Sequence, residues 1–257
     1  MVEVKKEEMD KLAPLFQGWD ETPIWSCLQG CMGRAWACES AEKPQAAQII
    51  TGDLCFFAGE PEDQLIENIP GDFPSQYILM VPESHKWAAG IERIYQNRYE
   101  RFMRYAIKKE PGIFDRKRLA GYIQKLSQEY SIKSIDEEIY LKTRQVSWSK
   151  DLCSQFPTYA DYKKNGLGFV AFHGDELVSG ASSYTVYRDG IEIEIDTRED
   201  HRRKGLALAC AASLILECLD RELYPSWDAA NRESVALAEK LGYNFDQEYV
   251  TYSIAVR

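Results

Sequence analysis

One stretch of the chain, from Ile191 to Ala238, constrains the fold more than any other. It begins with a strict alternation of apolar and acidic residues, Ile191 to Asp196, which predicts a strand. A short charged loop, 197–201, follows, and a run of small and apolar residues from Leu206 to Leu219 predicts a helix. The stretch therefore places a strand, a basic turn and a helix in direct succession.

The junction between this strand and this helix has the chemistry of an anion site. The first turn of a helix presents backbone N–H groups without intrahelical partners, together with a partial positive charge. Gly205 allows close approach of the backbone and Ala207 adds little bulk. A phosphate would be well held there, and the alternative is a solvated basic loop that caps a helix. Four basic residues surround the turn: Arg198, Arg202, Arg203 and Lys204.

The order of the elements favours the first interpretation. The pattern Arg202-x-x-Gly205-x-Ala207 follows a strand, a second short strand is predicted at Tyr224–Trp227, and an asparagine-led helix then runs from Asn231 to KLGY. In these features the last half of the chain resembles the GNAT superfamily of acyl-CoA-dependent N-acetyltransferases. The sequence segment PSWDAAN, followed by SVALAEKLGY, resembles a narrower group, the acetyltransferases similar to the zwittermicin A self-resistance enzyme.

The resemblance implies an α+β fold class. Residues 113–257 are expected to form a GNAT fold, in which a mixed, mostly antiparallel sheet with two splayed central strands is flanked by helices. Residues 1–112 are expected to form an N-terminal α/β unit, which is either a degenerate copy of the GNAT fold or an unrelated cap on the acceptor side. Pro111-Gly112 is the expected boundary, and Tyr99–Ile107 before it is either a strand or a helix.

The resemblance also implies acetyl-CoA as the cosubstrate. Its pantetheine arm would add like a strand in the gap between the splayed strands, and its phosphates would lie on the basic turn. An asparagine at the start of the last helix would cap that helix and contact pantetheine. The implied cofactor-binding residues are Ile195, Asp196, Thr197, Arg202, Arg203, Lys204, Gly205, Leu206, Ala207, Leu208 and Asn231.

Two acids of the first strand, Glu192 and Glu194, are the candidate catalytic bases. A primary amine titrates near pH ~10 and must lose a proton before it attacks a thioester. A row of acids on a central strand is costly unless water or substrate reaches it, which favours a polar cleft where a carboxylate accepts that proton. Glu194 is nearer to the expected thioester, and the alternative is a strand with one solvated face.

Trp227 and Asp228 end the second strand and are the candidate substrate-binding residues. Asp228 would either bind an acceptor ammonium or form a turn, and the simpler interpretation of Trp227 is a core residue. Many GNAT enzymes place a tyrosine seven residues after the asparagine, where it protonates the leaving thiolate, but here that position is Ala238. The acid is then another group, such as Tyr184, Tyr187 or water.

Composition argues against several kinds of partner. Lys+Arg 31 and Asp+Glu 41 give a net charge of −10, which argues against nucleic acid. An acidic surface suits a cationic amine, and it also aids solubility. The seven cysteines include no Cys-x-x-Cys pair and there are three histidines, so we expect free thiols and no metal. No apolar run is long enough to span a membrane.

The resemblance implies that the protein is an acetyl-CoA-dependent N-acetyltransferase. It would move an acetyl group to a primary amine of a small molecule by direct attack in a ternary complex. If the narrower resemblance holds, the acceptor is an aminopolyol antibiotic or a similar cationic metabolite, and antibiotic resistance is the implied role. The alternative is a non-catalytic acyl-CoA-binding regulatory module. The protein is expected in the cytoplasm, without membrane or nucleic-acid partners, as a monomer or a homodimer.

Overall fold

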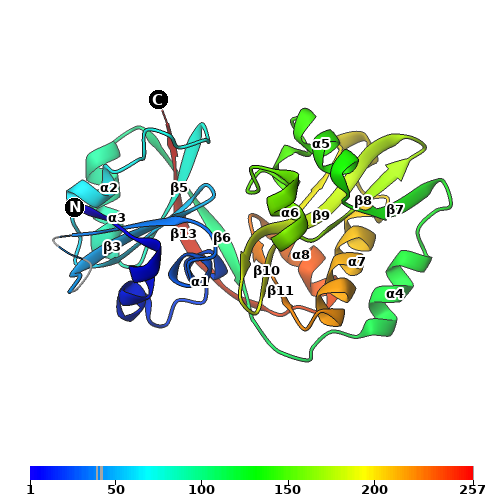
Figure 1. Cartoon of the computed structure of the whole chain (residues 1–257), viewed down its shortest axis with the longest axis horizontal. Coiled ribbons are helices and arrows are strands. Elements are labelled where there is room, and N and C mark those ends of the chain that lie inside the picture. The colour runs from blue at the N-terminus through cyan, green and yellow to red at the C-terminus, as the bar shows by residue number, and fades with distance from the viewer. Residues whose placement is uncertain (39, 41–42, 257) are drawn as a thin grey trace. The chain divides into compact units, whose positions relative to one another are not determined.

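The computed structural model describes residues 1–38, 40 and 43–256, which fall into two units (Figure 1). Unit 1 consists of Met1–Arg104 and the C-terminal segment from Glu248, and unit 2 consists of Tyr105–Gln247. The sequence-based domains, 1–112 and 113–257, instead give the C-terminal segment to the second domain. It belongs to unit 1 because the end of β13, residues 252–255, pairs antiparallel with β5.

Unit 1 contains a sheet in which the strand order is β1-β2-β3-β4-β5-β13, followed by β6 (Tyr99–Ile107). From β1 to β13 the neighbouring strands are antiparallel, except for the parallel pair β4–β5. Trp87, Ile91 and Tyr95 of α3 belong to the apolar core of this unit. The bounds are β1 Val2–Val4, the 3-10 helix η1 Lys6–Phe16, α1 Thr22–Leu28, β2 Arg34–Ala37, β3 Ala46–Thr51, β4 Leu54–Gly59, α2 Asp63–Ile66, β5 Tyr77–Pro82, α3 His85–Tyr95 and β13 Phe245–Ala255.

Unit 2 contains a five-stranded sheet with the order β11-β10-β9-β8-β7. The pair β10–β11 is parallel and the other pairs are antiparallel. The bounds are α4 Arg116–Gln124, β7 Tyr130–Ser134, α5 Glu137–Gln145, the 3-10 helix η2 Lys150–Leu152, α6 Tyr159–Asn165, β8 Gly168–His173, β9 Glu176–Tyr187, β10 Gly190–Thr197, the 3-10 helix η3 Glu199–His201, α7 Leu206–Asp220, β11 Tyr224–Ser226, β12 Asp228–Ala229 and α8 Arg232–Leu241.

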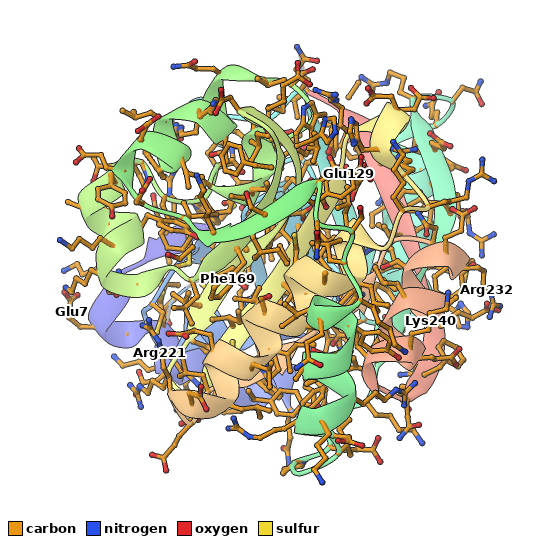
Figure 2. All side chains as sticks on the ribbon, turned by 90° about the vertical axis from the view of Figure 1, so that its right-hand side faces the viewer. Glu7, Glu129, Phe169, Arg221, Arg232 and Lys240 are labelled. Carbon is orange, nitrogen blue, oxygen red and sulfur yellow. The ribbon has the colours of Figure 1, made fainter. Side chains whose placement is uncertain are left out.

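Helices cover both faces of the sheet of unit 2. Helix α7 packs on one face, where Ile191 and Ile193 of β10 join its apolar core, and α4 lies beside α7 (Figure 2). On the other face, Leu152 of η2 packs over Gly180 of β9, and a Cβ at Gly180 would lie 2.6 Å from the Leu152 Cδ1 atom. The glycine therefore permits the close approach of η2 to the sheet.

The segment Tyr99–Ile107 is a strand, β6, and its last residues belong to unit 2. Tyr105 and Ala106 pair antiparallel with Ala229 and Asp228 of β12. The sequence pattern alone predicted either a strand or a helix for this segment. In the structure the burial of its residues does not alternate as it would in a strand with one buried face. Its pairing with a segment more than a hundred residues later in the chain decides in favour of the strand.

The parallel ladder between β10 and β11 is short. Its pairs are Gly190 with Tyr224, Ile191 with Pro225, and Glu192 with Ser226. Strand β10 then continues to Thr197. The segment that follows β11 instead turns at Trp227 and pairs with β6 as strand β12. The strand predicted at Tyr224–Trp227 is thus one residue shorter, because β11 ends at Ser226, and a further short strand, β12, follows at Asp228–Ala229 with a different partner. Strands β10 and β11 part after Glu192.

The two units share one order of elements. Apart from the short elements η2, η3 and β12 of unit 2, which have no counterpart among the described residues of unit 1, the two series agree: β1, η1, α1, β2, β3, β4, α2, β5, α3 in unit 1 and β7, α5, α6, β8, β9, β10, α7, β11, α8 in unit 2. The strands also pair in the same order, and β4–β5 corresponds to the parallel pair β10–β11. This supports a degenerate copy over an unrelated cap for the N-terminal unit.

Every helix among the described residues falls short of the length and apolarity needed to cross a membrane.

Candidate functional site

The loop between β10 and α7 presents a row of backbone N–H groups. Arg203 has φ +60° and Gly205 has φ +82°, so two residues of the loop adopt the left-handed conformation. Within the described part of the chain, no acceptor takes the N–H groups of residues 203–207. A Cβ at Gly205 would meet no atom within 4 Å, so the space in front of the loop is open. Such a concave row of N–H groups at a helix start binds anions.

The basic side chains of the loop divide into two groups. Arg198 is held by acids, since its guanidinium forms ion pairs with Asp200 at 2.7 Å and with Glu176 at 3.0 Å. Arg203 and Lys204 are exposed and have no ion-pair partner among the described residues. Arg202 is also exposed, and its Nε donates to the Thr197 carbonyl at 3.3 Å. The cations free to meet a phosphate are therefore those of 202–204.

The edge of β10 that faces away from β9 has no strand partner beyond Glu192 among the described residues. Ile195, Asp196 and Thr197 lie on this open edge, where a strand-like ligand could add. Ser179 of β9, which sequence reasoning missed, supports it: its hydroxyl lies 3.1 Å from the Asp196 carbonyl oxygen and 2.7 Å from Thr197 Oγ1. Burial raises the pKa of Asp196, against the hydrogen bond that its carboxylate accepts from the Thr197 N–H.

The two candidate bases lie in different surroundings. Glu192 is buried, with 5% of its surface exposed, so a fully solvated acid face does not describe it. Glu194 is half-buried and pairs with Ser182, which places it on the sheet face that α6 and η2 cover. Glu192 lies at the point where the two strands part, and Glu194 lies beside the open edge.

Three tyrosines lie near Glu192. Burial raises the pKa values of Tyr187, Tyr224 and Tyr243 above their usual range, and the negative charge of Glu192 raises each further. The Tyr187 hydroxyl lies 3.0 Å from Ser226 Oγ, and that of Tyr243 donates to the Pro225 carbonyl at 2.5 Å. These phenols stay protonated at neutral pH and can donate hydrogen bonds.

The remaining predicted residues lie around the start of α8. The Asn231 side chain accepts a hydrogen bond from the Ser234 N–H at 2.8 Å, so it caps the helix as expected. Trp227 is buried and its indole Nε1 donates to Ser234 Oγ at 3.0 Å, which places it in the core. Asp228 on β12 is half-buried. Ala238 is fully buried in α8.

Leu206, Ala207 and Leu208 form the first turn of α7, as the sequence predicts. Leu206 is buried in the core of unit 2, whereas Ala207 and Leu208 are partly exposed. Gly205 immediately precedes them as the N-terminal cap residue of the helix. The predicted phosphate-binding residues 202–208 are thus contiguous around one helix start.

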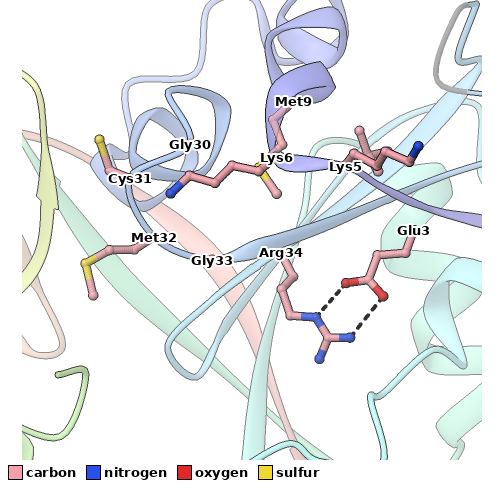
Figure 3. A pocket seen from close by; sticks show the side chains of 10 residues that line it. Glu3, Lys5, Lys6, Met9, Gly30, Cys31, Met32, Gly33 and Arg34 are labelled. Atoms are coloured by element: carbon pink, nitrogen blue, oxygen red, sulfur yellow. Dashed lines mark hydrogen bonds and ion pairs between the residues drawn. The ribbon is translucent and has the colours of Figure 1, made fainter. Parts of the chain in front are cut away.

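A separate cavity of about 490 Å³ lies in unit 1 (Figure 3). The start of η1 and the turn before β2 line it, including Lys6, Cys31 and Met32. At its edge the Arg34 guanidinium pairs with both carboxylate oxygens of Glu3, at 2.8 and 3.0 Å. None of the residues predicted from the motifs lines this cavity.

The cysteines and possible metal ligands offer no second centre in the described residues. All seven cysteines are free thiols, and only Cys31 is exposed. Within residues 1–38, 40 and 43–256, no group of three or more His, Cys, Asp or Glu side chains could hold a metal ion.

Sequence comparison and structure comparison with known proteins point to the same family. The family model described as GNAT acetyltransferase matches residues 13–252. A protein of Bacillus subtilis (strain 168), named Uncharacterized N-acetyltransferase YdfB, is 28% identical over 261 residues, with 97% of each chain covered.

Solved structures agree with the predicted fold class. A GCN5-related N-acetyltransferase-like protein from Streptococcus suis 89/1591 has a TM-score of 0.90 and 42% identity, covering 96% of this chain and 98% of that one. A tandem GNAT protein from the clavulanic acid biosynthesis pathway has a TM-score of 0.60 at 11% identity, covering 99% and 97%, which is a likeness of fold alone. The predicted α+β class, with a GNAT fold in the C-terminal part, is confirmed.

Proposed function

The chain belongs to the GNAT acetyltransferase family, and we propose that it moves an acetyl group from acetyl-CoA to a primary amine of a small molecule. Membership of the family makes it an N-acetyltransferase, and the family uses acetyl-CoA as the acyl donor. The observation that supports this chain's own site is the row of N–H groups at 203–207 beside an open strand edge. A diphosphate and a strand-like pantetheine arm fit these two features.

In the proposed mechanism, Glu194 accepts a proton from the acceptor ammonium, directly or through water. The neutral amine nitrogen then attacks the thioester carbon in a ternary complex, so that a C–N bond forms and the C–S bond breaks. The second proton that the nitrogen must lose passes through water or a hydroxyl group to the leaving thiolate, which gives the amide and CoA. The position of Glu194 beside the open edge of β10 supports its assignment as the base. Glu192 is the second candidate.

The leaving thiolate takes a proton from water or from a phenol. Tyr187 is a candidate by position, because its hydroxyl lies near the point where β10 and β11 part, whereas burial raises the pKa of this phenol and makes it a weaker acid. Tyr184, half-buried on the same strand, is the other tyrosine candidate. Ala238 excludes a tyrosine donor at the position where many family members have one.

The acceptor is proposed to be a cationic amine that Asp228 helps to bind. The half-buried carboxylate of Asp228 on β12 and the net charge of −10 support a cationic substrate. Trp227 has less support as a substrate platform, because its ring is buried. The narrower assignment is that the acceptor is an aminopolyol antibiotic. It rests on the sequence segments PSWDAAN and SVALAEKLGY alone.

The first test is release of CoA from acetyl-CoA in the presence of a panel of primary amines, including aminopolyols. Turnover with one amine class would support the proposal and begin to name the acceptor. Binding of acetyl-CoA without turnover on any amine would favour a non-catalytic acyl-CoA-binding module instead. A rise in melting temperature with acetyl-CoA reports binding to the folded state.

The second test removes the free cations of the loop. The double variant Arg203→Ala with Lys204→Ala should raise the Kd for acetyl-CoA about tenfold or more, because charge-assisted contacts to phosphate are lost. The matched control is Lys117→Ala with Lys125→Ala, which removes the same charge from exposed positions at α4. Equal Kd values by calorimetry in the wild type and the first variant would contradict the assignment of this loop.

A further inference from the structure

Two of the three histidines of the chain lie against each other beside the basic loop. His201 ends the 3-10 helix η3 and its side chain is buried, with 7% of the residue exposed. Its ring lies 5.3 Å from that of His173 on β8 and 5.8 Å from that of Tyr130 on β7. The loop that begins α7 is thereby attached to the far strands of its own sheet through one imidazole.

The hydrogen bond of His201 with Tyr130 and its ion-pair contact with Asp200 suit both protonation states of the ring. Its Nδ1 lies 3.2 Å from the Tyr130 hydroxyl, which donates to a neutral ring and accepts from a charged one. Its Nε2 lies 3.7 Å from an Asp200 carboxylate oxygen. A proton can therefore be gained or lost without a change of partner.

The charges around His201 come from its own loop and from the neighbouring strands. Burial is the largest cause that lowers the pKa of His201, followed by the positive charge of Lys204, while Asp200 acts in the opposite direction. Arg198 and His173 lower it further.

More distant charges are already engaged. Glu176 of β9 pairs with Arg198 at 3.0 Å, and Glu129, before β7, lies 3.5 Å from His173 Nε2. Lys204 also acts on the pKa of His201, and among the described residues it has no ion-pair partner.

We propose that His201 is a positioning residue of the phosphate loop and that it makes acetyl-CoA binding depend on pH, with tighter binding at lower pH. This inference rests on the proposed function, because it takes the loop 202–208 as the site of the phosphates. His201 does not touch the reacting atoms, and it acts through the loop that it attaches to β7 and β8.

The direction follows from charge. A phosphate beside Lys204 offsets the positive charge that opposes protonation of His201, so the pKa of His201 is higher in the complex than in the free protein. The added affinity is complete below the pKa of the free protein and is lost as the pH rises through the pKa of the complex. Each unit of difference between the two pKa values changes the affinity about tenfold.

The test is the Kd for acetyl-CoA by calorimetry between about pH 5.5 and pH 8.5, in the wild type, His201→Asn and His85→Asn. The 3′-phosphate of the ligand titrates near pH ~6 and weakens binding as it is protonated, so the comparison between proteins carries the result. We expect the ratio of the Kd of the wild type to that of His201→Asn to fall by about tenfold from the high to the low end of this range. His85→Asn is the matched control, since His85 is exposed at the start of α3, and it should follow the wild type.

A merely structural role would raise the Kd of His201→Asn equally at every pH, and parallel curves would overturn the inference. Absence of acetyl-CoA binding to the wild type at every pH would instead overturn the proposed function of the loop. If His201→Asn does not fold, the His201 imidazole resonance is titrated in the wild type with and without acetyl-CoA, with assignment by His85→Asn and His173→Asn. A pKa that is higher with acetyl-CoA supports the inference, and an unchanged pKa overturns it.

Discussion

At the scale of single residues, Glu192 and Glu194 are separated by one residue on β10 and have different surroundings. Glu192 is buried near three phenols, whereas Glu194 is half-buried beside the open edge of the strand. A carboxylate that exchanges protons with an incoming amine must be reached by that amine or by water. Accessibility therefore favours Glu194 as the base, and Glu192 is the second candidate.

We predict that Glu194→Gln lowers kcat by about a hundredfold or more at neutral pH, the usual contribution of a general base. Activity should recover in part at high pH, where the free amine is already present in solution. The measurement is the pH–rate profile, with Glu192→Gln as the companion variant. A profile identical to that of the wild type would move the base elsewhere, to Glu192 first.

At the scale of elements, α8 begins at a residue with two possible roles. Asn231 caps the helix by accepting from the Ser234 N–H, and the resemblance gives the same side chain a contact with pantetheine. Serine and asparagine cap helices about equally well, but serine lacks the amide group. The two roles can therefore be separated by substitution.

We expect Asn231→Ala to lower the free energy of unfolding by about 1 kcal/mol and Asn231→Ser to change it by only a few tenths. If the amide also contacts acetyl-CoA, both variants should raise the Kd, because both lack the amide. Thermal unfolding and calorimetry are the measurements. An unchanged Kd in both variants would leave the capping role alone.

At the scale of the whole molecule, the chain carries two copies of one order of elements, and they differ at the turn that is proposed to bind phosphate in unit 2. Helix α2 of unit 1 has 4 residues, against 15 in the corresponding α7. The residues before α2 are acidic, EPE, where unit 2 has a basic loop. The main chain at the end of β4 is also engaged: the Gly59 N–H donates to Glu83 and the Gly59 carbonyl accepts from Trp87.

We therefore predict that one chain binds one acetyl-CoA. The acidic turn of unit 1 repels phosphate. The backbone groups of Gly59, which correspond to the open edge of β10, already form hydrogen bonds with the side chains of Glu83 and Trp87. Calorimetric titration should give a stoichiometry of one, and Arg203→Ala with Lys204→Ala should weaken that single event. A second binding event that survives in this variant would contradict the assignment of unit 1.

The sequence by itself determined the local elements of the site. Alternation predicted β10, the basic turn with Gly205 predicted the start of α7, and Asn231 predicted the cap of α8, because each depends on residues close together in the chain. The order of these elements was enough to identify the family resemblance and the fold class. The roles assigned to Glu194, Glu192 and Asp228 remain predictions.

Only the tertiary structure decided which distant segments pair. It ends the β10–β11 ladder at Glu192 and Ser226 and pairs the next two-residue strand, β12, with β6. It also gives β13 to the sheet of unit 1 and brings His201 against Tyr130 and His173. No local pattern carries these facts, because the free energy of a long-range pairing depends on the packing of the whole unit and on closing a long loop.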